Sequence, residues 1–320
     1  MKKMVIAALA AVAVWTMPGH AMAASLIPVG QVIGLEVSSN QVCVADFDEK
    51  LGKTAQDAGL QMGDEILQID GTIIDCVEDV HTALNRSKGQ VELKILRKNR
   101  EHTLCIKPEV TASGPKLGIL LRQGVTGIGT VTYYDPATGK FGSLGHGVSS
   151  SDGGLVEMTG GNAYGANVIS VVKGKCGQPG QLRGGVTGKT AIGELEKNTS
   201  RGLFGTVDNG WQGKTLETAE NHEIKCGKAT ILSTVAGNEP REYSVEILKL
   251  YPNNRSQGRN MVIRVTDPAL LEVTGGIVQG MSGSPIIQDG KLIGAVTHVL
   301  VNDRTMGYGI FIDNMLDAAA

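Results

Sequence analysis

Short apolar segments alternate with glycine-containing turns along most of the chain. Glycine contributes 44 of the 320 residues, and a glycine inside a helix is destabilising by roughly 0.5–1 kcal/mol relative to alanine. Tight turns between strands, in contrast, use the positive φ values of glycine at no steric cost. The glycines follow no G-X-Y period, which excludes a collagen-like fold. We therefore expect a mainly β protein.

The size and charge of the chain narrow the class of protein further. A typical domain has roughly 100–200 residues, so this length predicts two domains. Apolar residues make up 41% of the chain, which is enough for packed cores and argues against global disorder. The formal net charge is −2 and there is no basic block, so we expect no nucleic-acid partner.

The N-terminus has the pattern of an export signal. Two lysines precede an uncharged apolar run over residues 4–17, and Ala21-Met22-Ala23 forms an A-x-A cleavage pattern. The run is shorter than the roughly 20 residues that a membrane-spanning helix needs. We expect residues 1–24 to be a signal peptide, with a short membrane anchor as the alternative, and the rest of the chain to be extracytoplasmic.

The cysteines indicate neither a metal site nor a catalytic thiol. None forms a CxxC pair and none lies in a nucleophile motif, so we expect no metal and no cofactor. Their number is odd, so one stays unpaired within a monomer. Cys43 and Cys105 lie in apolar strand patterns, and we expect them to be buried. Cys176 and Cys226 are an alternative disulfide pair, and the fifth cysteine is Cys76.

Residues 27–110 have the pattern of a small β domain with one amphipathic helix. Strand-like alternation occurs near residues 33–37 and 91–95, and the segment 75–84 has apolar residues at helical spacing. The run from Asp57 to Leu67, DAGLQMGDEIL, resembles a PDZ domain. In that family a peptide adds as an extra strand beside a helix, and backbone amides of a loop capture its carboxylate.

The PDZ resemblance assigns candidate peptide-binding residues by position. Ile33, Gly34 and Leu35 match the carboxylate loop and the edge strand. Val80 and Leu84 match the side of the helix that faces the groove. The alternative for these last two apolar side chains is a place in the domain core.

A second region, residues 114–320, carries a candidate nucleophile near its end. Gly280-Met281-Ser282-Gly283-Ser284-Pro285 precedes a predicted hairpin, a pattern that resembles the end of chymotrypsin-like serine peptidases. The Ser282 hydroxyl would attack, and the amides of Gly280 and Ser282 would form the oxyanion hole. The G-x-S-x-G elbow fits less well, because proline and a strand follow here rather than a helix.

A serine nucleophile needs a base, and His146 is the best candidate among the six histidines. It follows a predicted hairpin, is flanked by glycines and lies before Ser282 in the chain, as the base of that fold should. His298, on a predicted strand after Ser282, leaves three alternatives open: a packed strand residue, a residue of the specificity pocket, or a rival base.

Spacing alone leaves several candidates for the carboxylate that should orient the base. Asp267 ends a predicted strand 15 residues before Ser282, whereas the usual chymotrypsin-like order has a much longer separation. The competitors are Asp135, Asp152 and Asp208, of which Asp135 is better explained as the first residue of a turn.

Taken together, a PDZ-like domain placed before this peptidase region resembles the SpoIVB (stage IV sporulation protein B) peptidase family of endospore-forming bacteria. The resemblance covers roughly residues 27–316. It implies a chymotrypsin-like double β-barrel after the PDZ-like domain, and it matches His146, Asp267 and Ser282 to the family triad. The motifs that carry it are Gly127-Ile128-Gly129-Thr130, Leu144-Gly145-His146, Pro179-Gly180, Gly202-Leu203-Phe204-Gly205 and the run from Thr266 to Val299.

The resemblance also implies a role. Members are exported into the space between the forespore and mother-cell membranes, and contact with a membrane through the N-terminus is expected. They cleave themselves and then a regulatory subunit of a membrane metalloprotease, which triggers processing of pro-sigma-K. Gln181 departs from the acid expected there, and the N-terminus is short for an anchor.

Two other classes of function stay open. One is a general exported quality-control protease, although that class usually has the reverse domain order. The other is a catalytically silent PDZ protein that only binds a partner, against which the presence of all three triad residue types argues.

Overall fold

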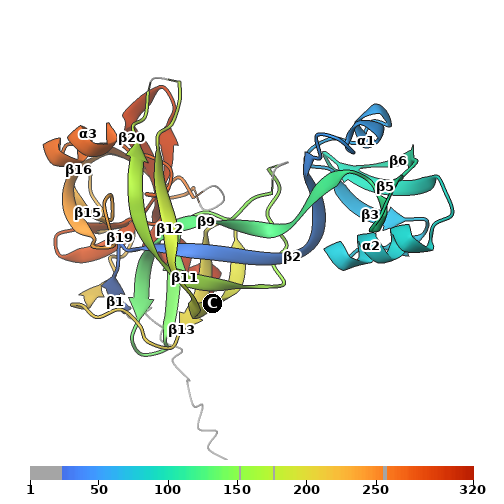
Figure 1. The fold of residues 1–320 in the computed structure, drawn as a ribbon. Coiled ribbons are helices and arrows are strands. Elements are labelled where there is room, and N and C mark those ends of the chain that lie inside the picture. The colour runs from blue at the N-terminus through green and yellow to red at the C-terminus, as the bar shows by residue number, and fades with distance from the viewer. Residues whose placement is uncertain (1–23, 151–152, 176, 255–257) are drawn as a thin grey trace, which may run out of the picture.

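The computed structural model describes residues 24–150, 153–175, 177–254 and 258–320, so the predicted signal segment lies outside the described residues. The chain forms two packed β-barrels and a smaller lobe at the end of a long strand ribbon (Figure 1). The mainly β fold expected from the glycine distribution is confirmed. Within the described ranges, no helix is long and apolar enough to cross a membrane.

The first barrel is a ring of six strands that closes where β9 pairs with β2. In ring order the strands are β2 (Val32–Phe47), β9 (Ile119–Asp135), β10 (Lys140–Ser143), β13 (Gly202–Val207), β12 (Gln181–Thr199) and β11 (Gly160–Val172). Two short strands, β1 (Ser25–Pro28) and β14 (Leu216–Glu217), extend the sheet beside β9. Fully buried side chains such as Ile33, Phe141 and Leu203 fill the interior.

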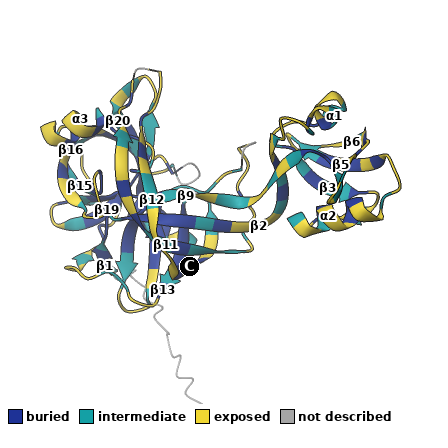
Figure 2. Ribbon diagram, viewed as in Figure 1, coloured by how far each residue is buried: buried dark blue, intermediate teal, exposed yellow. Residues whose placement is uncertain are grey.

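The second barrel is formed by the last third of the chain. Its ring order is β15 (Gly227–Ser233), β16 (Arg241–Leu250), β17 (Met261–Val265), β20 (Asp303–Phe311), β19 (Lys291–Leu300) and β18 (Pro285–Gln288). Helix α3 (Pro268–Thr274) follows β17, and α4 (Ile312–Ala319) ends the chain. Figure 2 shows buried residues running through the strands of both barrels.

The smaller lobe has the helix and strands that the PDZ resemblance predicted. It contains α1 (Lys53–Asp57), β3 (Glu65–Ile69), β4 (Thr72–Ile73), α2 (Val77–Arg86), β5 (Val91–Arg97) and β6 (Arg100–Ile106), with the hairpin β7 (Glu109–Thr111) and β8 (Gly114–Lys116) after them. Its apolar core is separate from those of the barrels, and Ile66, Ile69 and Leu93 are among its fully buried members.

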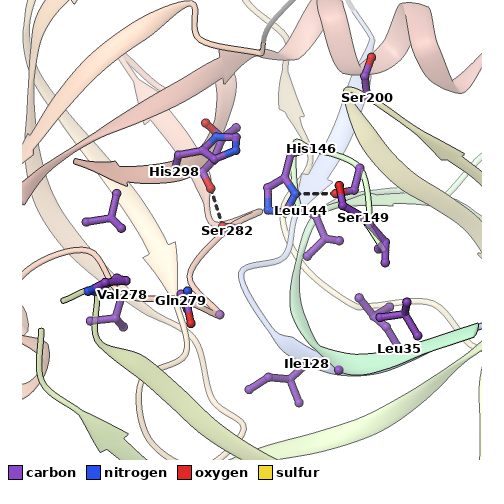
Figure 3. Close-up of a pocket in the computed structure, with 18 of the residues that line it drawn as sticks. Leu35, Ile128, Leu144, His146, Ser149, Ser200, Val278, Gln279, Ser282 and His298 are labelled. Carbon is purple, nitrogen blue, oxygen red and sulfur yellow. Dashed lines mark hydrogen bonds between the residues drawn. The ribbon is translucent and has the colours of Figure 1, made fainter. Parts of the chain in front are cut away.

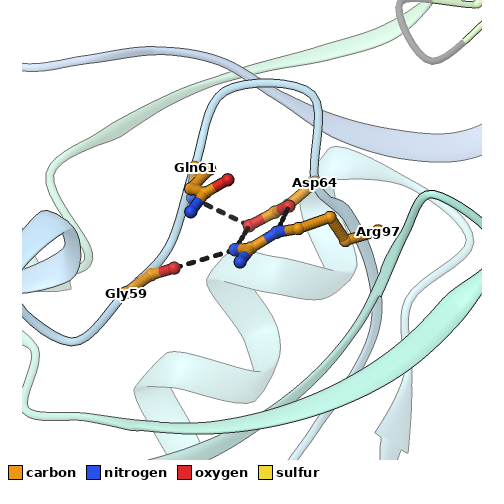
Figure 4. A network of polar contacts seen from close by, with 4 residues as sticks. All are labelled: Gly59, Gln61, Asp64 and Arg97. Carbon is orange, nitrogen blue, oxygen red and sulfur yellow. Dashed lines mark hydrogen bonds and ion pairs between the residues drawn. The ribbon is translucent and has the colours of Figure 1, made fainter.

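A buried polar network explains the GLQMGD run of this lobe (Figure 4). Asp64 is only 1% exposed, and its carboxylate accepts hydrogen bonds from Arg97 Nε at 2.6 Å and from the Gln61 amide at 2.8 Å. Arg97 also donates to the Gly59 carbonyl at 2.8 Å. The hydrogen bonds that Arg97 donates to Asp64 raise the pKa of Arg97, and this charged pair ties the turn to β5.

The lobe is joined to the first barrel by both β2 and β9. These strands pair from Val32 opposite Thr130 to Val37 opposite Val125, and again from Val42 opposite Gln123 to Phe47 opposite Ile119, with a register shift between. The PDZ-like lobe is therefore inserted between two neighbouring strands of the first barrel. The predicted range 27–110 therefore also includes β1 and the first half of β2, which pair with strands of the first barrel.

This insertion also corrects the predicted position of Ile33, Gly34 and Leu35. They lie in the barrel half of β2, with β11 paired on one side and β9 on the other. Since both edges of the strand are occupied, no peptide can add there. A β-carbon on Gly34 would lie 2.8 Å from Val186 Cγ2, so close packing on β12 accounts for the glycine.

The two helix residues assigned to the peptide groove lie in the core of the lobe. Val80 and Leu84 are each 2% exposed and pack with the buried strands of that lobe, which is the core alternative. Cys43 and Cys105 were both expected to be buried, but Cys43 is half-buried and Cys105 is exposed on the solvent side of β6. Cys176, of the alternative disulfide pair, lies outside the described residues.

Candidate active site

The loop that carries Ser282 runs from the end of α3 to β18 and depends on two glycines with positive φ. Gly280 has φ 97° and Gly283 has φ 98°. A β-carbon on Gly283 would lie 2.0 Å from the Thr130 carbonyl oxygen, so only glycine fits this position. The Gly283 amide donates to the Val296 carbonyl at 2.7 Å, which fixes the loop against β19.

The two serines of the loop have different surroundings. Ser282 lines a cavity of about 1040 Å³, together with His146 and His298 (Figure 3). Its hydroxyl donates a hydrogen bond to the Thr297 carbonyl at 2.5 Å. Ser284 is fully buried and donates to Ser233 Oγ at 3.0 Å inside the second barrel. Only the Ser282 hydroxyl can therefore reach a substrate.

A sharp turn after β10 presents His146 to the same cavity. Leu144 and Gly145 have φ values of 67° and 68°, and a buried leucine in the left-handed region is strained, as residues at functional sites often are. A β-carbon on Gly145 would lie 2.9 Å from Thr297 Cγ2, so the turn packs directly on β19. The histidine of one barrel is thereby placed beside the serine of the other.

The protonation of His146 is set by burial and by a neighbouring carbonyl. Its Nδ1 atom lies 2.9 Å from the Gly147 carbonyl oxygen. A carbonyl only accepts, so Nδ1 carries the proton and Nε2 is left as an acceptor. Burial lowers the pKa of His146, against a smaller opposite contribution from the Gly147 hydrogen bond. A neutral ring with a free Nε2 lone pair is the state that a general base requires.

His298 lies on the cavity wall next to His146. The two ring centroids are 5.1 Å apart, and the His298 pKa is lowered to about 4 by burial first and then by the charges of His146 and Arg259. Its buried Nδ1 atom has no hydrogen-bond partner in the described part of the chain. His298 is therefore neutral at pH 7 and packs against the base, and the Ser282 hydroxyl bonds Thr297 rather than this ring.

Asp267 is not brought to His146. Its Oδ1 atom accepts from the Ala269 and Leu270 amides at 3.0 and 3.1 Å, and Oδ2 accepts from the Ser244 amide at 3.3 Å. The carboxylate thus caps the N-terminus of α3. This corrects the expectation that Asp267 orients the base.

None of the competing aspartates takes that position either. Asp135 stabilises the β9–β10 turn by accepting from Ala137 and Thr138, as its turn assignment predicted. Asp208 is exposed, and Asp152 lies outside the described residues. Over the ranges that the structure describes, no carboxylate contacts His146, and the Gly147 carbonyl alone fixes its tautomer.

The peptide group that carries the Gly280 amide is held by β12. The Gln279 carbonyl accepts from the Leu182 amide at 2.8 Å, and the Gln279 amide donates to the Gly180 carbonyl at 2.8 Å. In a trans peptide the C=O and the following N–H point in opposite directions. The Gly280 amide therefore points away from β12, and neither it nor the Ser282 amide donates to any described acceptor. Two unused amides beside the nucleophile fit an oxyanion hole.

A threonine of β9, to which the sequence motifs assigned no role, contacts both catalytic segments. Thr130 is fully buried. Its hydroxyl donates to the Gly280 carbonyl at 2.7 Å, its amide donates to the Ser282 carbonyl at 3.3 Å, and its carbonyl accepts from the Leu144 amide at 3.2 Å. The only signal in the sequence was its place in the Gly127–Thr130 motif.

The cavity walls next to Ser282 are mainly apolar. The lining includes Ile277 and Val278, which precede the oxyanion loop, and Val299 and Val301, from β19 and the turn after it. The charged side chain in the lining is Arg259, whose guanidinium lies 5.0 Å from the Tyr308 ring centroid.

The chain was compared with families of known proteins and with solved structures. A family model described as SpoIVB peptidase S55 matches residues 114–316, and a PDZ domain model matches residues 32–107. A solved structure of the inactive form of Rv3671c from M. tuberculosis H37Rv is similar at 15% identity and a TM-score of 0.34, over 61% of this chain and 80% of that one. No curated protein sequence matches the chain.

Two barrels that bring a histidine and a serine to one cavity, with a PDZ domain inserted in the first, define a chymotrypsin-like serine peptidase. The chain belongs to the SpoIVB peptidase S55 family, as its motifs predicted.

Proposed function

We propose that this protein is an endopeptidase in which Ser282 is the nucleophile and His146 is the base and then the acid. The observation that carries this proposal is that Ser282 and a neutral His146 line one cavity. The amides of Gly280 and Ser282 stabilise the oxyanion, and the Gly147 carbonyl holds the His146 tautomer.

The reaction begins with a rotation of the Ser282 hydroxyl from the Thr297 carbonyl toward His146 Nε2. The oxygen then attacks the scissile carbonyl while its proton passes to Nε2. His146 returns that proton to the leaving amine as the C–N bond breaks, and an acyl-enzyme remains. A water molecule, deprotonated by His146, hydrolyses the ester and restores Ser282.

The walls of the cavity support an aliphatic, uncharged residue on the acyl side of the scissile bond. Val278, which precedes the oxyanion loop, and Val299 of β19 both line the cavity that holds Ser282. An Asp at position 299 introduces a charge there, so Val299→Asp should shift the preference toward basic residues in a peptide library.

Family membership and the PDZ domain support a finer role. We infer that the protein is exported, cleaves itself, and then cleaves a regulatory subunit of a membrane metalloprotease during endospore formation, in the space between the two membranes. The PDZ-like lobe would select that partner and other copies of the chain. A general quality-control protease and a silent binding protein are the competing roles.

Mass spectrometry of the purified protein's own N-terminus over time tests this function. Wild-type protein should acquire one or a few defined new N-termini, and Ser282→Ala should acquire none. Adding wild type to tagged Ser282→Ala protein shows whether the cut occurs between copies. Unrestricted degradation of a denatured protein would support the quality-control role, and the absence of any cut would support the silent binder.

A further inference from the structure

Thr130 is the point where the first barrel contacts both halves of the catalytic site. Its hydroxyl is bonded to the Gly280 carbonyl, its amide to the Ser282 carbonyl and its carbonyl to the Leu144 amide, two residues before His146. It is fully buried, and it lies on β9, the strand that continues into the PDZ-like lobe. These contacts join segments that are 150 residues apart in the chain.

Gly280 needs such a restraint because of its own conformation. With φ at 97° and no side chain, its backbone can rotate at little steric cost. A rotation would turn the Gly280 amide out of the oxyanion hole. Leu182 holds the peptide group before Gly280, and the Thr130 hydroxyl holds the peptide group after it. The orientation of the Gly280 amide is therefore fixed from both sides.

We propose that the Thr130 hydroxyl is a positioning group for the oxyanion hole: it acts through the Gly280 carbonyl and keeps the Gly280 amide directed at the developing negative charge. Loss of one oxyanion donor typically costs roughly 10²–10³-fold in kcat. Loss of the hydroxyl that positions this donor should cost about 10–100-fold in kcat with little change in KM, because the charge develops only in the transition state.

A neighbouring threonine provides the matched control. Thr132 is also fully buried on β9, and its hydroxyl donates to the Gly283 carbonyl at 2.8 Å. This bond has the same chemistry and reaches the same loop, but Gly283 lies after the nucleophile and its peptide group carries no oxyanion donor. Thr132→Val should lower the melting temperature about as much as Thr130→Val and leave kcat within about 3-fold.

The test uses the full chain, a peptide p-nitroanilide that the wild type cleaves, and the aldehyde of the same peptide, whose adduct with Ser282 has an oxyanion. Thr130→Val should lose about 10–100-fold in kcat and a similar factor in aldehyde affinity. Thr130→Ser keeps the hydroxyl and should stay within about 3-fold of wild type. A similar kcat loss in Thr132→Val, or unchanged kcat in Thr130→Val, overturns the proposal.

Two further measurements keep the test decisive. If Thr130→Val does not fold, Thr130→Cys, with its weaker donor, must lose more kcat than Thr130→Ser, and equal values overturn the proposal. The inference rests on Ser282 as the nucleophile. Ser282→Ala tests that premise separately, because residual cleavage there would refute the proposed function, whatever Thr130 does.

Discussion

The PDZ-like lobe and the catalytic region each contain stabilising hydrogen bonds, but the bonds of the two regions span different distances along the sequence. In the lobe, Arg97 bonds residues 33 and 38 positions earlier in the chain. In the catalytic region, the hydroxyls of Thr130 and Thr132 bond carbonyls 150 and 151 positions away. The lobe can therefore form its polar network from its own segment, whereas the catalytic site exists only after both barrels have closed.

The largest expected effect separates the two serines of the nucleophile loop. Ser282→Ala should lower cleavage by about 10⁴–10⁶-fold without loss of stability, because the attacking hydroxyl is removed. Ser284→Ala should keep most activity and lose about 1 kcal/mol of stability with the buried bond to Ser233. Rates of self-cleavage and thermal melting measure both. Equal rate losses in the two variants would contradict the assignment of Ser282.

A pair of glycines tests the dependence of the site on barrel closure. Gly283→Ala should cost about 3 kcal/mol or more and abolish activity, since the new methyl group meets the Thr130 carbonyl. Gly290→Ala has a similar φ of 78° but no atom within 4 Å of the added carbon. It should cost about 1 kcal/mol and keep its activity. Urea unfolding and peptide hydrolysis report the two effects.

The independence of the lobe is tested by removal of its buried carboxylate. Asp64→Ala leaves Arg97 without its partner and should destabilise the lobe by about 2–3 kcal/mol. Hydrolysis of a short peptide should stay within about 2-fold of wild type, while cleavage of a protein partner falls. The exposed Asp57→Asn is the control. A parallel loss of peptide hydrolysis would show that the two regions are coupled.

The smallest effect concerns pH. Burial lowers the pKa of His146, so the neutral base persists into mildly acidic solution, and the acidic limb of kcat/KM should have its midpoint below 6.5. The pKa of His298 is near 6.5 in the unfolded chain and about 4 in the folded chain. Between these two pH values the unfolded chain binds a proton at His298 and the folded chain does not. The melting temperature should therefore fall as the pH drops from 6.5 to 4, and less so in His298→Asn. A midpoint above 6.5 would contradict the burial of His146.

Local motifs carried much of what could be predicted. The Gly-x-Ser-Gly-x-Pro run requires a particular loop geometry wherever it occurs, and Gly145-His146-Gly147 marks a tight turn. The structure brings both to one cavity. The PDZ resemblance also rested on a local run, and the Asp64–Arg97 network includes two residues of that run, Gly59 and Asp64.

The two corrected assignments concern partners that are distant in the sequence. The alternation at Ile33–Leu35 predicted a strand correctly. It could not predict the neighbouring strands, because alternation contains no information on which strands pair. For Asp267 a local signal was available: an aspartate directly before a proline is typical of a helix N-cap with proline at the first helical position. The family resemblance, and not the spacing from Ser282, suggested a catalytic role, which the capping hydrogen bonds of Asp267 do not support.

The insertion of the PDZ-like lobe between β2 and β9 limits where the proposed self-cleavage could leave the fold intact. The chain before the lobe contributes β1 and half of β2 to the catalytic barrel, and Leu26, Ile27 and Ile33 are buried in it. A cut before β1 would leave every strand of the barrel continuous. A cut within residues 28–38 would break the chain in β2 or between β1 and β2, so repeated self-cleavage there would act as a timer that ends the activity unless the severed strand stays in place.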